Sequence, residues 1–170
     1  MKITDKHVFF WGQYLSNWHE APFTVEYEGK KYRFHNTEQY FMFVKAKTFG
    51  DDEIAKEIVA KGKNPAIAKA LGRKVKNYDD KVWNEKRYQV MLEANMEKYT
   101  QNEILKNSLL NKKYDGKHFV EASPYDTIWG IGVGEKEAKD DESNWRGTNL
   151  LGKVLDEVRN KLISHQTNEA

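Results

Sequence analysis

The chain has 170 residues, of which 39% are hydrophobic and 13% aromatic, enough for one folded domain with its own core. Its 28 basic and 26 acidic residues leave a net charge of +2, which argues against a protein that binds nucleic acid by charge alone. The absence of cysteine excludes disulfides, thiol catalysis and zinc–thiolate sites, and it suits a cytosolic location.

Signals for membranes, secretion and metals are missing from the sequence. No apolar run is long enough to span a bilayer, and residues 1–7 lack the apolar stretch of a signal peptide. The five histidines are scattered, and no pair has metal-ligand spacing. We therefore expect no metal site, no cofactor and no membrane partner.

The N-terminal part predicts a strand, a turn and a hairpin. Residues 8–11 are apolar and predict a buried strand. Ser16 and Asn17 indicate a turn, but small polar residues amid aromatics also suit a ligand phosphate or ribose. Both interpretations stay open. Alternating residues over 23–34, interrupted by Glu28-Gly29, predict a short β-hairpin.

Residues 36–47 form the segment around which we expect the site. Asn36 can cap a helix, and Gln39 can reach back to the cap, as in a capping box. Glu38 and Lys45 are seven residues apart, so they project from the same side of a helix with a rise of roughly 10 Å between them. Because side chains lean toward the helix N-terminus, Lys45 leans toward Glu38.

The spacing of Glu38 and Lys45 has two interpretations. In the first, an acid and an amine face one ligand-sized gap, with Phe41 and Met42 as its floor. In the second, the segment is an amphipathic core helix with two solvated charges. Both interpretations fit the pattern.

Helical spacing predicts further helices over about 51–62, 64–72, 81–99 and 102–110, which indicates a mostly α-helical domain with a small hairpin. After the second of these, Arg73, Lys74 and Lys76 form a basic cluster. The cluster is either a solvated loop or a contact for a phosphate-bearing ligand.

The stretch 119–134 is the second informative segment. Asp126 and Trp129 precede a run that contains Gly130 and Gly132, where bare backbone allows close approach. A carboxylate beside an indole and exposed backbone suits a sugar or base site. An Asx turn followed by a core tryptophan explains the same residues.

A charged segment over 135–143 is expected to be a mobile loop. The apolar stripe that begins at Leu150 predicts a final helix. Asn149 can cap it, which would put the Asn149 amide at a positive helix end where a phosphate or sugar oxygen is favoured.

Five sets of residues occur in one order along the chain: Leu15–Asn17, Thr37–Phe41 with Lys45, Trp83 with Met91, Asp126 with Trp129–Gly132, and Asn149–Gly152 with Arg159. Taken together, these motifs resemble the NADAR family, to which YbiA-like proteins belong. The resemblance runs from about Phe9 to Leu162. The chain departs from many members between Leu110 and Lys117, and Gln39 replaces a histidine common in bacterial members; both differences bear on substrate choice.

The resemblance implies one mostly helical YbiA-like domain over residues 1–170, with a core at about 9–162. It implies cleavage of the N-glycosidic bond between a phosphorylated ribose and an amino group. Two substrate classes follow: ADP-ribosylated guanine in DNA, RNA or nucleotides, and phosphoribosylamino-pyrimidine intermediates of riboflavin synthesis. A non-catalytic ADP-ribose-binding module and a structural or nucleic-acid-binding protein are the alternatives.

Residue roles follow from the chemistry of that bond. Glu38 and Asp126 are candidate acid/base or ribose-anchoring groups. Lys45 is the candidate nucleophile, because an unprotonated amine can form a Schiff base with the opened sugar. A rival scheme uses the carboxylates and water, with Lys45 as an electrostatic aid. The expected ligand-site lining is Ser16, Asn17, Trp129, Gly130, Gly132 and Asn149, with Trp129 stacking on the base or sugar.

Overall fold

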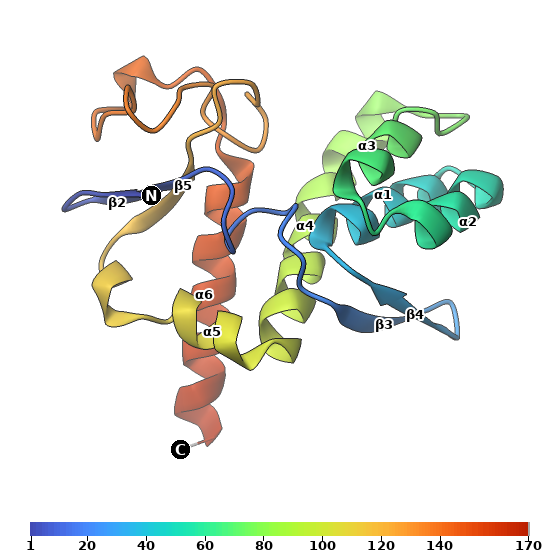
Figure 1. Cartoon of the computed structure of the whole chain (residues 1–170), viewed down its shortest axis with the longest axis horizontal. Coiled ribbons are helices and arrows are strands. Elements are labelled where there is room, and N and C mark those ends of the chain that lie inside the picture. The colour runs from blue at the N-terminus through green and yellow to red at the C-terminus, as the bar shows by residue number, and fades with distance from the viewer. Residues whose placement is uncertain (170) are drawn as a thin grey trace. The chain divides into compact units, whose positions relative to one another are not determined.

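The computed structural model describes residues 1–169, with side chains for 1–168. The chain forms two compact units, which we describe separately. The terminal unit comprises Met1–Ser16 with Glu103–Ala170, and the central unit comprises Asn17–Asn102. Figure 1 labels the elements of both units. Helices predominate over short strands in the described residues, as predicted, but the strands form a three-stranded sheet in addition to the predicted hairpin. A single domain over 1–170 stays a prediction.

The central unit contains the hairpin and four helices (Figure 1). The predicted hairpin is confirmed: its strands pair antiparallel with Phe23 opposite Phe34. The connecting residues Glu28 and Gly29 have φ angles of 49° and 78°, the left-handed conformation that a tight two-residue turn requires. The elements are β3 (Phe23–Tyr27), β4 (Lys30–Phe34), α1 (Thr37–Thr48), α2 (Asp52–Lys61), α3 (Pro65–Gly72) and α4 (Asp80–Gln101).

Asn36 begins α1 as predicted, but Gln39 does not complete the capping box and α4 begins one residue before the predicted 81. Asn36 accepts a hydrogen bond from the backbone N–H of Gln39 at 2.8 Å, as expected of a cap. The Gln39 side chain, however, accepts from the N–H of His35 at 2.7 Å, one residue before the cap. Helix α4 is capped by Asp79, and Asp80 is already its first helical residue.

Helix α1 is the centre of the unit and packs against α2, α3 and α4. It is buried on most of its circumference and is therefore not an amphipathic surface helix. Phe41 packs against Trp83 of α4 with ring centroids 5.0 Å apart. Phe43 packs against Tyr32 of the hairpin with centroids 4.8 Å apart. This packing fixes the helix from which Glu38 and Lys45 project.

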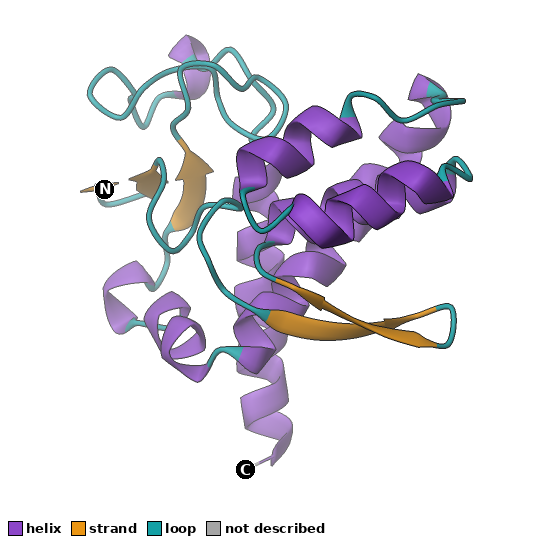
Figure 2. Cartoon of the chain, turned by 45° about the vertical axis from the view of Figure 1, so that its right-hand side comes forward, coloured by secondary structure: helices purple, strands orange, loops and turns teal. Residues whose placement is uncertain are grey.

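The terminal unit combines a small sheet with a long helix. The strand predicted at 8–11 is found as β2, and it pairs in parallel with β5, which the sequence did not predict. Helix α6 packs on β5; Figure 2 shows the strands in orange and the helices in purple. The elements are β1 (Lys2–Ile3), β2 (His7–Phe10), α5 (Glu103–Leu109), η1 (Lys112–Tyr114), β5 (His118–Glu121), η2 (Glu142–Asn144) and α6 (Leu150–Glu169).

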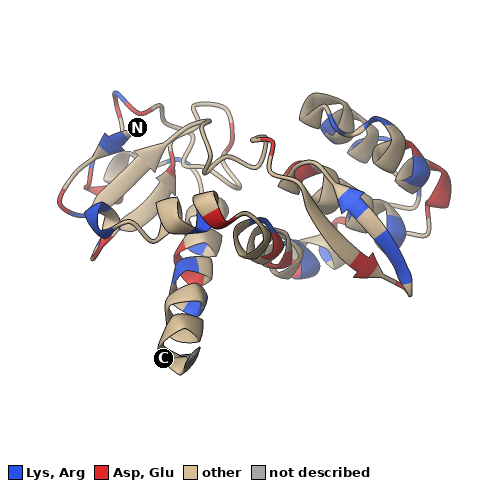
Figure 3. Cartoon of the chain, turned by 60° about the horizontal axis from the view of Figure 1, so that its bottom comes forward, with Lys and Arg blue, Asp and Glu red and all other residues tan. Residues whose placement is uncertain are grey.

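The β3–β4 hairpin separates acidic from basic side chains by strand, whereas α6 mixes the two (Figure 3). On the hairpin, β3 carries one acidic residue, Glu26, and β4 carries the basic residues, whereas α6 carries both signs along its length. Within the described residues, no helix combines the length and the hydrophobicity needed to cross a bilayer.

Candidate active site

Asn17 holds the first turn of α1, which carries Glu38. The Asn17 backbone carbonyl accepts a hydrogen bond from the N–H of Glu38 at 3.2 Å and another from the Thr37 hydroxyl at 3.0 Å. The Thr37 hydroxyl also lies 2.9 Å from the side-chain oxygen of Asn17. Asn95 of α4 donates to the same side-chain oxygen at 3.4 Å. Asn17 therefore fixes the backbone beneath Glu38, and a direct ligand contact by Asn17 stays a prediction.

Glu38 is a nearly buried acid, with 7% of its surface exposed. It lies in the first turn of α1, where the positive end of the helix dipole stabilises a carboxylate. A carboxylate held in a largely water-free position has few competing solvent contacts, so its interactions with nearby charges are strong.

Lys45 is a half-buried amine two turns along α1 from Glu38. Its Nζ lies 4.6 Å from the centroid of the Tyr78 ring. Burial lowers the pKa of Lys45, the carboxylate of Glu38 raises it, and the charge of Arg73 lowers it again, with a net shift below the usual value. The electrostatic interaction with Glu38 supports the first interpretation of the spacing, in which the acid and the amine face each other.

Lys47, the next lysine on α1, has a different environment. Its ammonium contacts Asp52 at 2.9 Å and Glu28 at 3.6 Å. The hydrogen bond to Asp52 is the main reason why the pKa of Lys47 is raised. Two lysines separated by one residue thus differ in the direction of their pKa shifts: the pKa of Lys45 is lowered and that of Lys47 is raised.

The residues expected to form the floor of the gap are used in helix packing. Phe41 is buried against Trp83, as described above. The thioether of Met42 lies against Gly72 at the end of α3, where an added Cβ would be 2.2 Å from the Met42 Sδ. Gly72 thus lets α3 approach α1 at the turn that precedes Lys45.

In the terminal unit, Asp126 closes a turn. One of its carboxylate oxygens accepts hydrogen bonds from the N–H groups of Ile128 at 2.9 Å and Trp129 at 2.8 Å. The Ser123 hydroxyl oxygen accepts from the N–H of Asp126 at 3.1 Å. This is the Asx turn that we considered as the alternative interpretation. Trp129 is half-buried, and the catalytic role of Asp126 and the stacking role of Trp129 stay predictions.

The glycines after Trp129 allow two loops to pack backbone to backbone. A Cβ at Gly130 would lie 2.8 Å from the carbonyl oxygen of Glu121, and Gly132 has a φ of 69°. A Cβ on Gly147 in the opposite loop would lie 2.3 Å from the Gly130 carbonyl oxygen. The close approach that the glycines predicted therefore involves another segment of the protein, and ligand contacts by Gly130 and Gly132 stay predictions.

Asn149 connects the start of α6 to β5. Its side-chain oxygen accepts from the N–H of Glu121, and its side-chain nitrogen donates to the carbonyl of Phe119, both at 3.0 Å. The amide thus bonds to the strand and does not cap α6. Ser16, the remaining expected lining residue, is half-buried, and its N–H donates to the carbonyl of Gln13 at 3.1 Å. Ligand contacts by Asn149 and Ser16 stay predictions.

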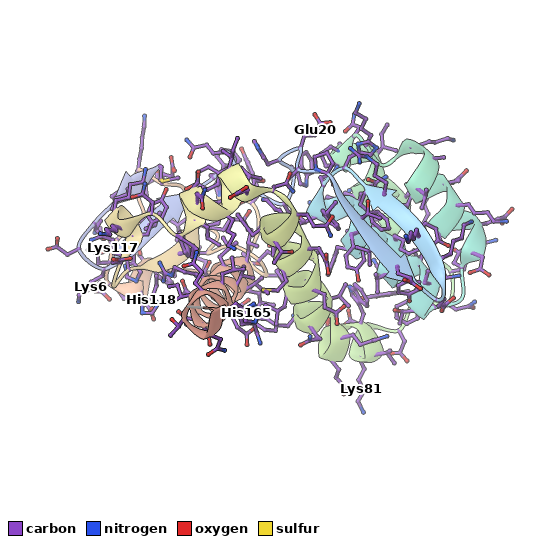
Figure 4. The ribbon with its side chains drawn as sticks, turned by 90° about the horizontal axis from the view of Figure 1, so that it is seen from below. Lys6, Glu20, Lys81, Lys117, His118 and His165 are labelled. Carbon is purple, nitrogen blue, oxygen red and sulfur yellow. The ribbon has the colours of Figure 1, made fainter. Side chains whose placement is uncertain are left out.

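The terminal unit contains a pocket of about 460 Å³, and neither Glu38 nor Lys45 is among its lining residues. Figure 4 labels His118, one of its lining residues, at the same end of the unit as Lys6 and Lys117. His118 is hydrogen-bonded to Asp156 at 2.9 Å, and both side chains belong to the pocket wall. Of the residues expected to contact the ligand, the pocket wall includes Asn149.

The buried amine of Lys98 was not predicted from the sequence. Lys98 of α4 is 0% exposed, and burial lowers its pKa to about 7. Its Nζ lies 5.0 Å from the centroid of the Tyr99 ring. The signal was present, because Lys98 follows Met91 by seven residues and Ala94 by four, which puts it on the same apolar stripe of the helix.

The chain is similar to two curated proteins over most of its length. A sequence model of the NADAR domain matches residues 9–163. Protein irg-1 of Caenorhabditis elegans is 44% identical over 145 residues, which are 84% of this chain and 67% of irg-1. N-glycosidase R617 of Acanthamoeba polyphaga mimivirus is 38% identical over 166 residues, which are 92% of this chain and 96% of the viral protein.

The fold also matches a solved structure. The NMR structure of the E. coli protein YbiA gives a TM-score of 0.72 at 26% identity and covers 98% of this chain and 90% of YbiA. This match confirms the expected YbiA-like fold. Since the domain model spans nearly the whole sequence and two relatives exceed 35% identity, this chain belongs to the NADAR family.

Proposed function

We propose that this chain hydrolyses the N-glycosidic bond between a phosphorylated ribose and an amino group. N-glycosyl hydrolysis in general is supported by membership of the NADAR family and by the similarity to a viral protein named an N-glycosidase. The observation that carries the proposal is the interaction between Glu38 and Lys45 on α1, an acid and an amine of lowered pKa. A module that only binds ADP-ribose would have no need for this pair.

Glu38 and Lys45 together can supply the proton and the nucleophile that cleavage of the N-glycosidic bond requires. The departing nitrogen must receive a proton, and a nearly buried carboxylic acid such as Glu38 can deliver one. The ribose C1′ is at the oxidation level of an aldehyde, so a neutral amine can attack it once the sugar ring has opened. Lys45 meets this second requirement, because its burial favours the uncharged form.

In the route through a covalent Lys45 imine, bonds, protons and electrons balance without an oxidant or a cofactor. Ring opening moves the C1′–O4′ electron pair to O4′, which takes a proton, and leaves an imine to the substrate nitrogen. Lys45 Nζ adds to C1′, a proton passes to the substrate nitrogen, and the C1′–N bond of the substrate breaks. Water then hydrolyses the Lys45 imine, which releases the sugar as an aldehyde and restores the amine. In this sequence Glu38 donates and accepts the protons.

We propose ADP-ribosylated guanine as the substrate, with the exocyclic amino group of guanine as the leaving group. This assignment rests on the family resemblance. The phosphoribosylamino-pyrimidine intermediates carry the same type of bond, a ribose C1′ joined to an exocyclic amine, and are the proper competitors in an assay.

The test is to offer both substrate classes to the purified protein and to identify the products by mass spectrometry. Release of free ADP-ribose and unmodified guanine is the expected result. Release of ribose 5-phosphate from the pyrimidine intermediates alone would assign the other substrate class. Tight binding of ADP-ribose without turnover of either compound would contradict an enzymatic function.

A further inference from the structure

The segment after α3 runs along the face of α1 that carries Lys45. Gly72 ends α3 in contact with Met42, which precedes Lys45 by three residues and therefore lies on the same side of α1. Tyr78, six residues after Gly72, contacts Lys45 through its ring. Both ends of the segment 72–78 are thus placed against the face of α1 that carries the proposed nucleophile.

The backbone of this segment is held in place by hydrogen bonds. The N–H of Lys74 donates to the carbonyl of Leu71 at 2.9 Å, and the side chain of Val75 is buried. The N–H of Lys76 donates to a carboxylate oxygen of Asp51 at 2.9 Å. Since Asp51 also caps α2, the segment is tied to two helices. Its side chains therefore project from a fixed frame rather than from a loose loop.

The Arg73 side chain is exposed and forms no hydrogen bond or ion pair with another described residue, whereas its backbone N–H donates to the carbonyl of Lys69 at 3.2 Å. Its charge nevertheless acts on Lys45, because it lowers the pKa of that amine. Two cationic side chains close enough to interact repel each other, which is unfavourable unless an anion binds nearby. Lys74 and Lys76 belong to the same basic cluster, but neither contributes to the pKa shift of Lys45.

The chemistry of the guanidinium identifies the anion. Arg73 is always charged and presents a planar set of donors that matches a phosphate in a bidentate contact. The proposed substrates bring such a phosphate with them, on C5′ of the ribose whose C1′ reacts. We infer that Arg73 binds the 5′-phosphate of the substrate ribose and thereby positions C1′ at Lys45. This inference rests on the proposed function.

An Arg73 that binds the 5′-phosphate makes the enzyme selective for 5′-phosphorylated ribosides. The decisive substrates are a guanine whose amino group carries ribose 5-phosphate and the same compound without the phosphate. Wild type should prefer the phosphorylated compound in kcat/KM. At a pH above the acid limb, where the charge effect of Arg73 on Lys45 no longer limits turnover, Arg73→Gln should lower kcat/KM for that compound about 10- to 100-fold, the range for losing hydrogen bonds to a charged group. The dephosphorylated compound should lose far less under the same conditions.

Lys74→Gln is the matched control, because it removes an equally exposed charge from the adjacent position. It should keep the preference for the phosphorylated compound. A preference that is unchanged in Arg73→Gln, or lost equally in Lys74→Gln, would overturn the inference.

A binding measurement separates the inference from the proposed function. Titration with ribose 5-phosphate should show binding to wild type and to Lys74→Gln, and binding at least about tenfold weaker to Arg73→Gln. Equal affinity of the three proteins would refute the role of Arg73 even if the enzyme is active. Weaker binding by Arg73→Gln together with no turnover by wild type would contradict the proposed function and leave the phosphate contact supported.

Discussion

The ammonium nitrogen of Lys45 lies 4.6 Å from the centroid of the Tyr78 ring. The face of an aromatic ring favours a cation, so Tyr78 opposes the effects of burial and of Arg73, which favour the neutral amine. Tyr78 is itself fixed, because its hydroxyl donates to Asp80 at 2.8 Å and its ring packs 5.3 Å from that of Phe49. Burial and Arg73 thus lower the pKa of Lys45, whereas Glu38 and the face of the Tyr78 ring favour its charged form.

Arg73→Gln should move the acid limb of the kcat/KM profile to higher pH. The active form of Lys45 is the neutral amine, which accumulates as the pH rises through its pKa. Arg73 lowers that pKa, so removing its charge raises it. Arg73→Lys keeps the charge and should keep the wild-type limb. The pH dependence of kcat/KM reports the free enzyme and is the measurement to make; an acid limb that stays in place in Arg73→Gln would contradict this account.

Glu38→Gln should fold normally and lose at least about a hundredfold in turnover, the usual scale for removing a general acid or base. The carboxylate of Glu38 also raises the pKa of Lys45, so the residual activity should have its acid limb at lower pH, opposite to Arg73→Gln. Turnover and melting temperature, measured together, check both effects. Near-normal turnover would remove Glu38 from the mechanism.

Much of the fold could be predicted because its signals are local. The Asn36 cap and the Glu28-Gly29 turn each act within a few residues, and both are found as expected. Strand β5 was missed because its partner is β2, more than a hundred residues away, where His7 pairs with His118. A parallel pair of this kind has no short-range sequence signature; its register is set by the packing of the whole unit.

The same distinction applies to the candidate site. Glu38 and Lys45 lie on one helix, so their spacing alone predicted that they share a side. Tyr78 contacts Lys45, and the charge of Arg73 acts on it, where Gly72 at the end of α3 lies against Met42 of α1. No sequence pattern specifies that helix contact. Similarly, the glycines at 130 and 132 predicted a close approach to the backbone, but the sequence did not show that the approaching group is another protein segment and not a ligand.

Two variants of Asp126 separate its structural role from a chemical one. Asp126→Asn keeps the side-chain oxygen that accepts the N–H groups of Ile128 and Trp129, so the melting temperature should hardly change. Asp126→Ala removes both hydrogen bonds and should lower the free energy of unfolding by about 1–3 kcal/mol, at about 1 kcal/mol for each bond. If Asp126 acts as an acid or base, Asp126→Asn should still lose turnover. Full activity in Asp126→Asn would restrict Asp126 to the Asx turn.

The buried amine of Lys98 should make the protein more stable as the pH rises above neutrality. Burial lowers the pKa of Lys98 to about 7 in the folded state, below the usual value of 10.5. Between these two values the unfolded chain binds more protons, so the free energy of unfolding increases with pH. Denaturant unfolding from pH 7 to 9 measures this slope, and Lys98→Met should flatten it.

Trapping with borohydride tests the covalent route through Lys45. During turnover, borohydride should reduce the imine between Nζ and C1′ to a stable secondary amine. Intact-mass analysis should then show one sugar-containing adduct, and peptide mapping should place it on Lys45. The trapping requires a neutral amine, which is the form that the burial of Lys45 favours.

Lys47 provides the control on the same helix. Its ammonium is bound by Asp52 and Glu28, and its pKa is raised, so it should remain charged and unlabelled. Lys45→Arg should abolish both trapping and turnover, because a guanidinium stays charged and cannot form the imine. Lys47→Arg should change neither. Normal turnover in Lys45→Arg without any trapped adduct would rule out the covalent route and favour direct attack by water, with Glu38 as the base and the cation at position 45 as an electrostatic aid.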